Sequence, residues 1–431
     1  MRFKYNLEDR PPFIELLFFA LQWFVIAVPT IVIIGKISAD FHFNNPANEI
    51  VYFQKLTFVM GISIFTQVIA GHRMPIIIGP STVLLIGIIA SHNTGPETIY
   101  SSILLGGCML FLLSISKFFE HLVRFFTPRV ISVVLLLIAF TLMPTITNLI
   151  LPKQSIADPL GNIIFASALT GSMFVLYKRL KGFGRSTLII WSIVGGSMLN
   201  FIFFPAQTSP EILDNVPVLS GFFHNVITGI SIDPGVLIAF FLCFMALSVN
   251  DLGSIQAMNE ILQTPDPNQR ITRGILITGL ANILSGFLGV IGPVNYSLSP
   301  GVIASTGCAS RWALLPVSIL LCFISFSPAI LGFISHVPSL IIGCILFFIL
   351  SFQVAAGLAL FLKSNKGDLL EGSLIIGLSI TIGMVIAFLP DHALNAIPAM
   401  LRPIVGNGFV MGVFTALVLE HLIFRNLHST S

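Results

Sequence analysis

Apolar residues run along this 431-residue chain in long blocks that short polar segments interrupt. A helix needs roughly 20 apolar residues to cross the hydrocarbon core of a bilayer. By that measure the pattern predicts fourteen spanning segments, seven in each half of the chain. Their approximate ranges are 13–35, 50–70, 75–91, 99–118, 128–151, 162–178 and 186–204, then 236–258, 271–291, 298–310, 312–333, 337–362, 369–390 and 405–424. The third and the tenth are too short and too interrupted for ordinary spanning helices.

The predicted fold is an all-α polytopic membrane protein organised as a 7+7 inverted repeat. An odd number of spans in each half gives the two halves opposite orientations, which is typical of transporters whose binding site lies at broken helices near the midplane. The two interrupted spans occupy matching positions of the halves, because Pro80 and Pro300 are 220 residues apart.

These two interrupted spans predict two short antiparallel strands, at about 76–79 and 294–298, each turning into a half-helix. Gly79 and Ser299 are acceptable N-cap residues, and Pro80 and Pro300 suit the first turn of a helix, with Gly301 following. Freed backbone groups at this depth have to pair or line a cavity, since lipid cannot bond them. Two simple proline kinks are the alternative.

Composition points to lipid as the solvent. Hydrophobic residues make up 55% of the chain and charged residues 9%, whereas soluble domains carry about 25% charged residues. The five cysteines all lie in apolar runs without a C-x-x-C pair, so no metal site or disulfide framework is expected. Walker-type and H-E-x-x-H motifs are absent from the sequence, so neither ATP hydrolysis nor zinc proteolysis is indicated, and no cofactor or nucleic-acid partner is expected.

The basic residues give the orientation. With the N-terminus in the cytoplasm, 17 of the 21 Lys and Arg residues fall on predicted inside segments, as the positive-inside rule requires. The outside segments hold the other four: Lys36, Lys55, Lys153 and Arg402. We expect a multi-pass protein of the bacterial inner membrane with both termini cytoplasmic. The charged first ten residues precede an apolar run without a small-residue cleavage site, so that run is expected to be a retained span.

Polar side chains inside the apolar runs are candidates for function. Asp251 lies deep in the eighth span, with Asn250 beside it and Ser254 one helical turn after Asn250. These residues predict a hydrogen-bonding wall for a substrate, with Asp251 as a proton acceptor. The alternative is that Asp251 only braces the broken helices.

Other polar and aromatic residues are less strongly indicated as functional. Trp23 and Tyr296 are candidates for stacking on a flat ring. An interfacial or solvated role is expected for residues near the predicted membrane edges, namely His72, Glu120, Glu371 and Glu420.

The chain resembles the nucleobase–ascorbate transporter family, also called nucleobase:cation symporter-2, which includes uracil and xanthine permeases. The resemblance rests on Arg10-Pro-Pro followed by Leu21-Gln22-Trp23, on Pro75-x-x-x-Gly79-Pro-Ser81, and on Leu298-Ser299-Pro300-Gly301 with Thr306-Gly307. This sequence differs from the family at the positions expected to bind substrate. Asn250 stands where the family has Glu, and Ser254 where it has a polar residue or His. Leu298 stands where it has Glu or Gln, and Trp23 where it has His. This pattern resembles the divergent purine permease branch.

The resemblance implies a homodimeric, H⁺- or Na⁺-coupled symporter for a nucleobase, most simply a purine, that works by alternating access. A core domain (13–118 and 232–333) would move against a gate domain (128–204 and 337–425). The expected substrate-binding residues are Asn250, Trp23, Ser81, Thr82, Tyr296, Ser297, Leu298 and Ser299, with Asp251 and Ser254 coupling or bracing.

Three other functions were weighed. A small-anion transporter of the same fold would bind its ligand between the half-helix N-termini, where backbone N–H groups favour negative charge. A membrane-embedded enzyme is not expected, because the nine histidines are dispersed and pair with no cysteine or carboxylate cluster. A passive channel is disfavoured, since broken helices between repeats suit alternating access.

Overall fold

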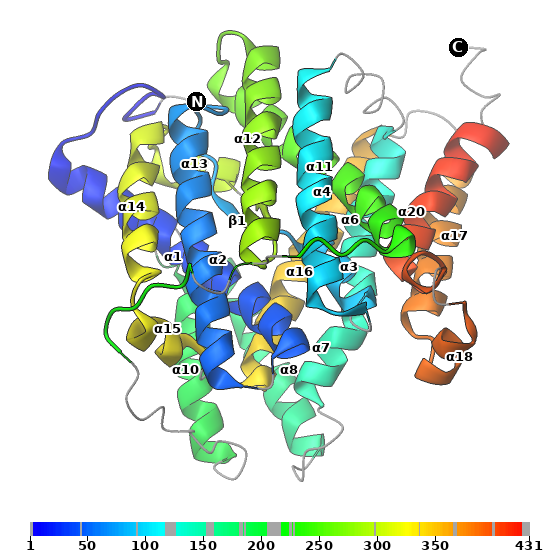
Figure 1. The fold of residues 1–431 in the computed structure, drawn as a ribbon. Helices are drawn as coiled ribbons and strands as arrows, with labels where there is room; N and C mark the ends of the chain where they lie inside the picture. The colour runs from blue at the N-terminus through cyan, green and yellow to red at the C-terminus, as the bar shows by residue number, and fades with distance from the viewer. Residues whose placement is uncertain are drawn as a thin grey trace.

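The computed structural model describes residues 3–43, 45–91, 94–116, 126–151, 159–180, 184, 187–204, 217–223, 226, 229–296, 299–335, 337–364, 369–398 and 401–424. Most of these residues are helical, and one two-stranded sheet lies among them (Figure 1). Within this described part, eight helices are long and apolar enough to cross a membrane, and three shorter apolar helices accompany them. A mostly helical fold with two short strands is therefore confirmed, while the number of fourteen spans stays a prediction.

The first half of the chain forms helices at all the predicted spans. Its elements are α1 (Phe13–His42), α2 (Pro46–Ile69), β1 (Ile78–Pro80), α3 (Thr82–Ala90), α4 (Pro96–Ile115), α6 (Pro128–Thr141), α7 (Met143–Ile150), α8 (Pro159–Arg179) and α10 (Leu188–Phe203). The predicted span at 128–151 is divided between α6 and α7. Pro144, in the first turn of α7, has no backbone N–H to continue the helical hydrogen bonds.

The second half is more interrupted. Its elements are α11 (Pro234–Leu262), α12 (Pro267–Leu288), β2 (Pro293–Asn295), α13 (Ser299–Thr306), η3 (Arg311–Leu314), α14 (Leu315–Ile324), α15 (Pro328–Ser335), α16 (Ser339–Ser364), α17 (Leu369–Ala387), α18 (Asp391–Ala396), α19 (Arg402–Val405), α20 (Gly408–Val418) and the π-helical η4 (Leu419–Ile423). The predicted span at 312–333 comprises three short helices, and the one at 405–424 begins in α19 and continues through η4.

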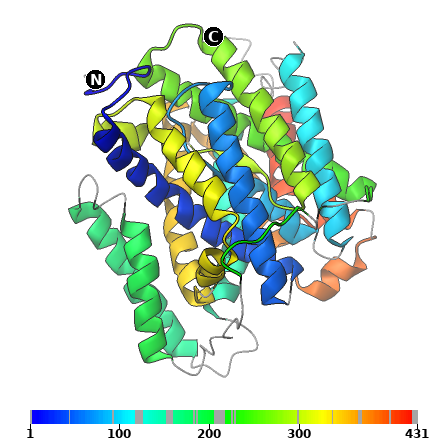
Figure 2. The ribbon, with the colours of Figure 1, turned by 60° about the vertical axis from the view of Figure 1, so that its left-hand side comes forward.

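The helices pack in two groups. In the first, α4 contacts α12, α2 contacts α14, and α3 contacts α11; in the second, α6 contacts α16, α17 and α20. The approach of α4 to α12 is very close, because a side chain added at Gly107 would meet the backbone of α12 and one added at Gly279 the backbone of α4. Small residues commonly allow such contacts between membrane helices. The pair α8 and α10 stands at the periphery (Figure 2).

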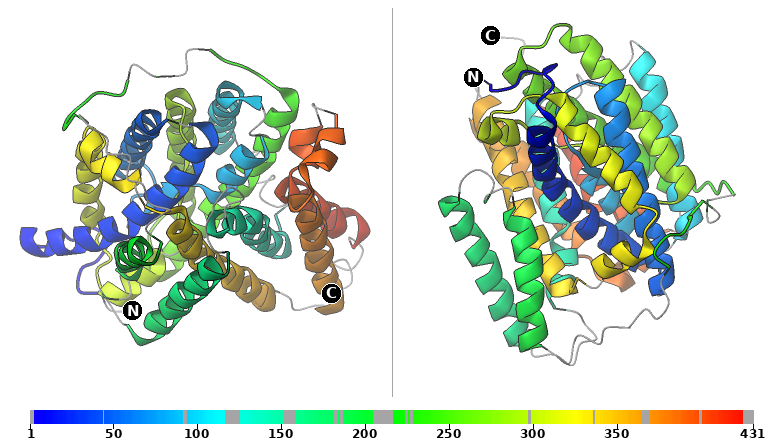
Figure 3. Two further views of the ribbon diagram at one scale, coloured as in Figure 1. Left: turned by 90° about the horizontal axis from the view of Figure 1, so that it is seen from below. Right: turned by 90° about the vertical axis from the view of Figure 1, so that its left-hand side faces the viewer.

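The two strands lie at mid-height of the molecule, between half-helices that run to opposite ends. In Figure 1, α3 leads toward the lower end and α13 toward the upper end. Helix α1 crosses the bundle obliquely in the view from below (Figure 3) and contacts β1 and α2. The strands are thus enclosed by α1, α2, α11 and α12, and all six strand residues are buried.

Candidate functional site

The two broken spans meet through their strands. β1 and β2 pair antiparallel, with Ile78 opposite Asn295. Hydrogen bonding continues beyond the strands, as the Tyr296 N–H donates to the Ile77 carbonyl at 2.9 Å. The predicted strand pair is confirmed, with three residues in each strand. Two predicted site residues of this stretch, Ser297 and Leu298, lie outside the described residues.

The first half-helix starts later than predicted. Ser81, not Gly79, is the N-cap of α3, and its hydroxyl accepts a hydrogen bond from the Leu84 N–H at 3.3 Å. Pro80 is the last residue of β1 and Thr82 the first of α3. A serine hydroxyl satisfies a free N–H group at a helix start, which glycine cannot do with a side chain.

Gly79 has a steric role instead. A Cβ atom added at this position would lie 2.5 Å from the ring of Tyr296. That ring lies across the strand, and its hydroxyl donates to the Pro80 carbonyl at 2.8 Å. Tyr296, a predicted stacking residue, therefore packs on the first break while belonging to the second.

The second half-helix is joined to the first break by Ser299. Its hydroxyl accepts from the Ile77 N–H at 3.0 Å and donates to the Tyr296 carbonyl at 2.8 Å. Ser299 is the first residue of α13, not its cap, and Pro300 and Gly301 follow within the first turn. The expectation that Pro300 occupies a first turn is thus correct, whereas Pro80 precedes its helix.

Asp251 is completely buried in α11 and is bonded to the second strand. Its Oδ1 accepts from both the backbone N–H and the side-chain amide of Asn295, each at 2.8 Å. Its Oδ2 accepts from the Thr278 hydroxyl of α12 at 2.6 Å. Three donors thus compensate a carboxylate that would otherwise be costly to bury. The geometry is that of a brace between α11, α12 and β2.

Ser254 is a second brace between α11 and the second strand, whereas the side chains of Asn250 and Thr82 take no part in this bonding. The Ser254 hydroxyl donates to the carbonyl of Asn295 at 3.0 Å and to that of Asn250 at 2.9 Å. The side chains of Asn250 and Thr82 are half-buried, and within the described part of the chain neither makes a hydrogen bond. Because neighbouring residues of a helix are about 100° apart, the side chain of Asn250 points in a different direction from that of the braced Asp251. Asn250 lies in α11 and Thr82 in α3, and these two helices contact each other.

Trp23 lies in α1, which contacts β1, and is only 2% exposed. The expected solvated role is wrong for Glu420 and His72, which are buried, while their position at the membrane interface stays a prediction. Glu420 is buried, accepts from the Thr127 hydroxyl at 2.8 Å and lies 3.8 Å from Arg129. His72 is fully buried. Glu371 is partly exposed and Glu120 lies outside the described residues.

His72 belongs to the network of the second break, although it follows α2. Its Nε2 lies 3.1 Å from Oδ1 of Asn295, and its Nδ1 accepts from the Met74 N–H at 3.0 Å. Gln67 of α2 connects the same region to α12, donating to the Thr278 hydroxyl at 3.1 Å. Hydropathy alone missed these groups; the available signal was the presence of amide and hydroxyl residues within apolar runs.

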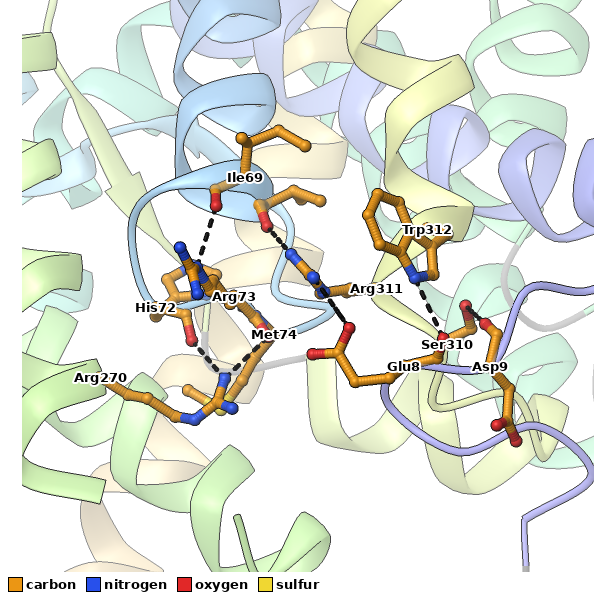
Figure 4. A network of polar contacts seen from close by, with 11 residues as sticks. Glu8, Asp9, Ile69, His72, Arg73, Met74, Arg270, Ser310, Arg311 and Trp312 are labelled. Carbon is orange, nitrogen blue, oxygen red and sulfur yellow. Dashed lines mark hydrogen bonds and ion pairs between the residues drawn. The ribbon is translucent and has the colours of Figure 1, made fainter. Parts of the chain in front are cut away.

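The turn that holds His72 is anchored by contacts with α12 (Figure 4), toward the end of the molecule at which the chain begins (Figure 1). Arg270 of α12 donates to the carbonyls of His72 and Arg73 at 3.0 and 3.1 Å. Nearby, Arg311 forms an ion pair with Glu8, in which Nε and Nη2 both donate to the same carboxylate oxygen, and it also donates to the Val68 carbonyl at 2.6 Å. These contacts attach the N-terminal segment, α2 and η3 to one another.

The N-terminal segment itself lies along the stretch after α13. The Lys4 N–H donates to the Gly307 carbonyl at 2.8 Å, and the Ala309 N–H to the Tyr5 carbonyl at 2.9 Å. The Ser310 hydroxyl donates to the Asp9 carbonyl at 2.6 Å (Figure 4). Residues 4–9 therefore hold the far end of the second half-helix.

An open cavity of about 970 Å³ lies at the opposite end of the molecule. Residues of α1 and α3 line one side, and residues of α6, α7, α17 and α20 line the other. The cavity thus separates the two packing groups of helices. Asp40 and Arg402, from different groups, are the charged residues among its lining.

Comparison of the sequence with protein families matches residues 14–392 to the Permease family. The chain is 26% identical to YwdJ of Bacillus subtilis, a purine permease by name, over 93% of this chain and 94% of that one. It is 24% identical to the xanthine permease of the same organism, over 85% and 86% of the two chains. It is also 24% identical to the xanthine permease XanP of Escherichia coli, over 97% and 94%.

Among solved structures, the fold is similar to the transmembrane domain of a cyanobacterial bicarbonate transporter, BicA. That similarity has a TM-score of 0.65 at 15% identity and covers 89% of this chain and 98% of the other. The murine anion transporter Slc26a9 is similar with a TM-score of 0.61 at 14% identity, over 98% of this chain and 70% of the other. These likenesses show the architecture.

Proposed function

We propose, from the premise that this chain belongs to the Permease family, that its cargo is a nucleobase, and specifically a purine. The family is one of transporters and not of enzymes, so the protein is a multi-pass membrane transporter. The purine assignment is supported by the names of relatives that align over nearly the whole chain.

The uncommitted side chain of Asn250 carries this proposal. An amide offers both a donor and an acceptor, which matches the adjacent N–H and carbonyl groups on the edge of an oxopurine. Asp251 is bonded on both oxygens, and this bracing supports a fixed backbone for its neighbour. Thr82, at the start of α3, offers a hydroxyl and the free N–H groups of a helix N-terminus.

In this proposal the predicted binding residues Ser81, Ser299, Tyr296 and Trp23 have different roles. The hydroxyls of Ser81 and Ser299 serve the backbone, so they shape the site without contacting the base. Tyr296 is half-buried and flanks the ring, while Trp23 is nearly enclosed. Backbone groups at Ser297 and Leu298 complete the proposed contacts.

We further propose the transport mechanism of a 7+7 inverted repeat, in which a core domain (13–118 and 232–333) moves against a gate domain (128–204 and 337–425). The two packing groups of helices support this division, and the cavity between them supports an outer vestibule. A gradient of H⁺ or Na⁺ would drive uptake.

The basic residues support an inner-membrane protein with both termini cytoplasmic. In Figure 1 the first described residues and the end of η4 lie toward the same end of the molecule, which supports an even number of crossings. A homodimer through the gate domains completes the proposal. Its natural location is the exposed apolar surface of the peripheral helices, where Trp191 and Met198 are more than half exposed.

A small anion is the second candidate cargo. It is favoured by the two half-helix starts, whose N–H groups attract negative charge. The site residues described here include no cationic side chain, whereas the amide of Asn250 suits a neutral heterocycle better. A base is therefore the first choice.

Thermal stabilisation of the purified protein tests the cargo. A ligand at 100 times its Kd stabilises the folded state by about 2.7 kcal/mol. We expect xanthine, hypoxanthine or guanine to raise the melting temperature of the wild type and of the control Asn268→Ala, an exposed position. Asn250→Ala should abolish that increase. Stabilisation by bicarbonate or sulfate and by none of the bases would instead establish the anion carrier.

A further inference from the structure

A chain of oriented hydrogen bonds leads from His72 to the neighbour of Asn250. Because Nδ1 of His72 accepts the Met74 N–H, the ring proton has to sit on Nε2. Nε2 therefore donates to Oδ1 of Asn295, 3.1 Å away. A proton on Nδ1 would face the Met74 N–H, so this one neutral tautomer fits.

The orientation of Asn295 follows from this tautomer. With Oδ1 turned to His72, the amide nitrogen of Asn295 faces Asp251 and donates to it at 2.8 Å. The reversed amide would put its oxygen against the carboxylate and its nitrogen against the His72 donor, which leaves two repulsive contacts in a buried site. His72 and Asp251 thus favour the same orientation of the amide from its two sides.

We propose that His72 is a positioning residue of the substrate site: by donating from Nε2 to Asn295 it orients the amide that holds Asp251, and so places β2 and Asn250 against the cargo. This inference rests on the proposed function for the identity of the cargo. His72 acts through Asn295 and does not touch the base. Its own turn is held from α12 by Arg270.

Two substitutions separate the two hydrogen bonds of His72. Glutamine places its amide nitrogen near the position of Nε2 and keeps the donor to Asn295. Asparagine places its amide oxygen near Nδ1 and keeps only the acceptor for the Met74 N–H. A role confined to bracing the turn requires the second bond, whereas positioning of Asn295 requires the first. Each variant loses one bond, so a general loss of stability affects both.

The measurement is saturable uptake of radiolabelled xanthine into proteoliposomes containing the full chain. We expect His72→Asn to raise KM about tenfold with little change in kcat, because a buried hydrogen bond is lost from the support of the binding face. His72→Gln should keep KM within about threefold of the wild type by the same relation. The exposed control His392→Asn should leave both constants unchanged. Equal losses in the two His72 variants, or a larger loss in His72→Gln, would overturn the positioning role.

Nitrogen-15 NMR of the ligand-free protein gives a readout independent of the cargo. The signals that disappear in His72→Gln should report an unprotonated Nδ1 and a protonated Nε2. The opposite tautomer overturns the inference even if xanthine is transported. If the wild type takes up bicarbonate and not xanthine, the nucleobase proposal fails, and the same KM comparison made with bicarbonate still decides the role of His72.

Discussion

The two breaks of the membrane helices differ in what holds them. The first, β1 with α3, is held by backbone pairing with β2, by the hydroxyls of Ser299 and Tyr296 from the second break, and by the short-range cap from Ser81. The second, β2 with α13, is bonded by three side chains from two other parts of the chain: Asp251 and Ser254 of α11, and His72 after α2. An inverted repeat need not have symmetric energetics. The first break serves as a fixed frame, whereas the geometry of the second depends on buried polar side chains and changes if these are substituted or protonated.

The largest effect is expected from removing the carboxylate of the second break. Asp251→Ala leaves the Thr278 hydroxyl and the backbone N–H of Asn295 buried without their acceptor, and leaves the Asn295 amide nitrogen only a long hydrogen bond to Thr278. Each unsatisfied group costs about 1–3 kcal/mol, so we expect severe loss of folded protein, measured by fluorescence-detected size exclusion. The surface control Asn268→Ala should fold normally. A well-folded Asp251→Ala protein would mean that the two breaks are held alike.

Acidification should destabilise the folded protein through His72, which is bonded to the second break. Burial lowers the pKa of His72, in the turn between α2 and β1, from 6.5 to about 3. Between these values the unfolded chain binds a proton that the folded protein excludes, so the free energy of unfolding falls as the pH falls below 6.5. At pH 5 the expected loss is about 2 kcal/mol. Melting temperatures across this range should fall less steeply for His72→Gln than for the wild type, and parallel curves would contradict the assignment.

The smallest effect is expected at the first break. Ser81→Ala removes the cap of α3 and should cost about 1 kcal/mol. Ser81→Thr, which keeps the hydroxyl, should restore most of it. Thermal unfolding in detergent measures both variants. A loss as large as that of Asp251→Ala would show that the first break is as dependent on one side chain as the second.

The local sequence predicts both breaks, because proline and glycine in short apolar runs directly affect the backbone conformation. It misplaced the cap by two residues, since Gly79 is required by the ring of Tyr296, and that contact joins residues 217 positions apart. His72 was assigned to the membrane edge because it follows an apolar helix. Its turn folds inward to Asn295, which local hydropathy cannot reveal. Asn250 stands out in the sequence, since an asparagine deep in an apolar run does so whatever the packing, and its contact with a substrate stays a prediction.

Antiparallel pairing of the strands has a consequence for biogenesis. Ile77 and its partner Ser299 are 222 residues apart, so at a synthesis rate of about 5–20 residues per second the first break waits on the order of 10–45 s for the second. During that interval its backbone groups have no strand to bond, and lipid offers them nothing. The nascent first half must therefore stay shielded in the insertion machinery or in water until β2 and Ser299 have been made, and assembly of the transporter is completed by a late joining of its two halves.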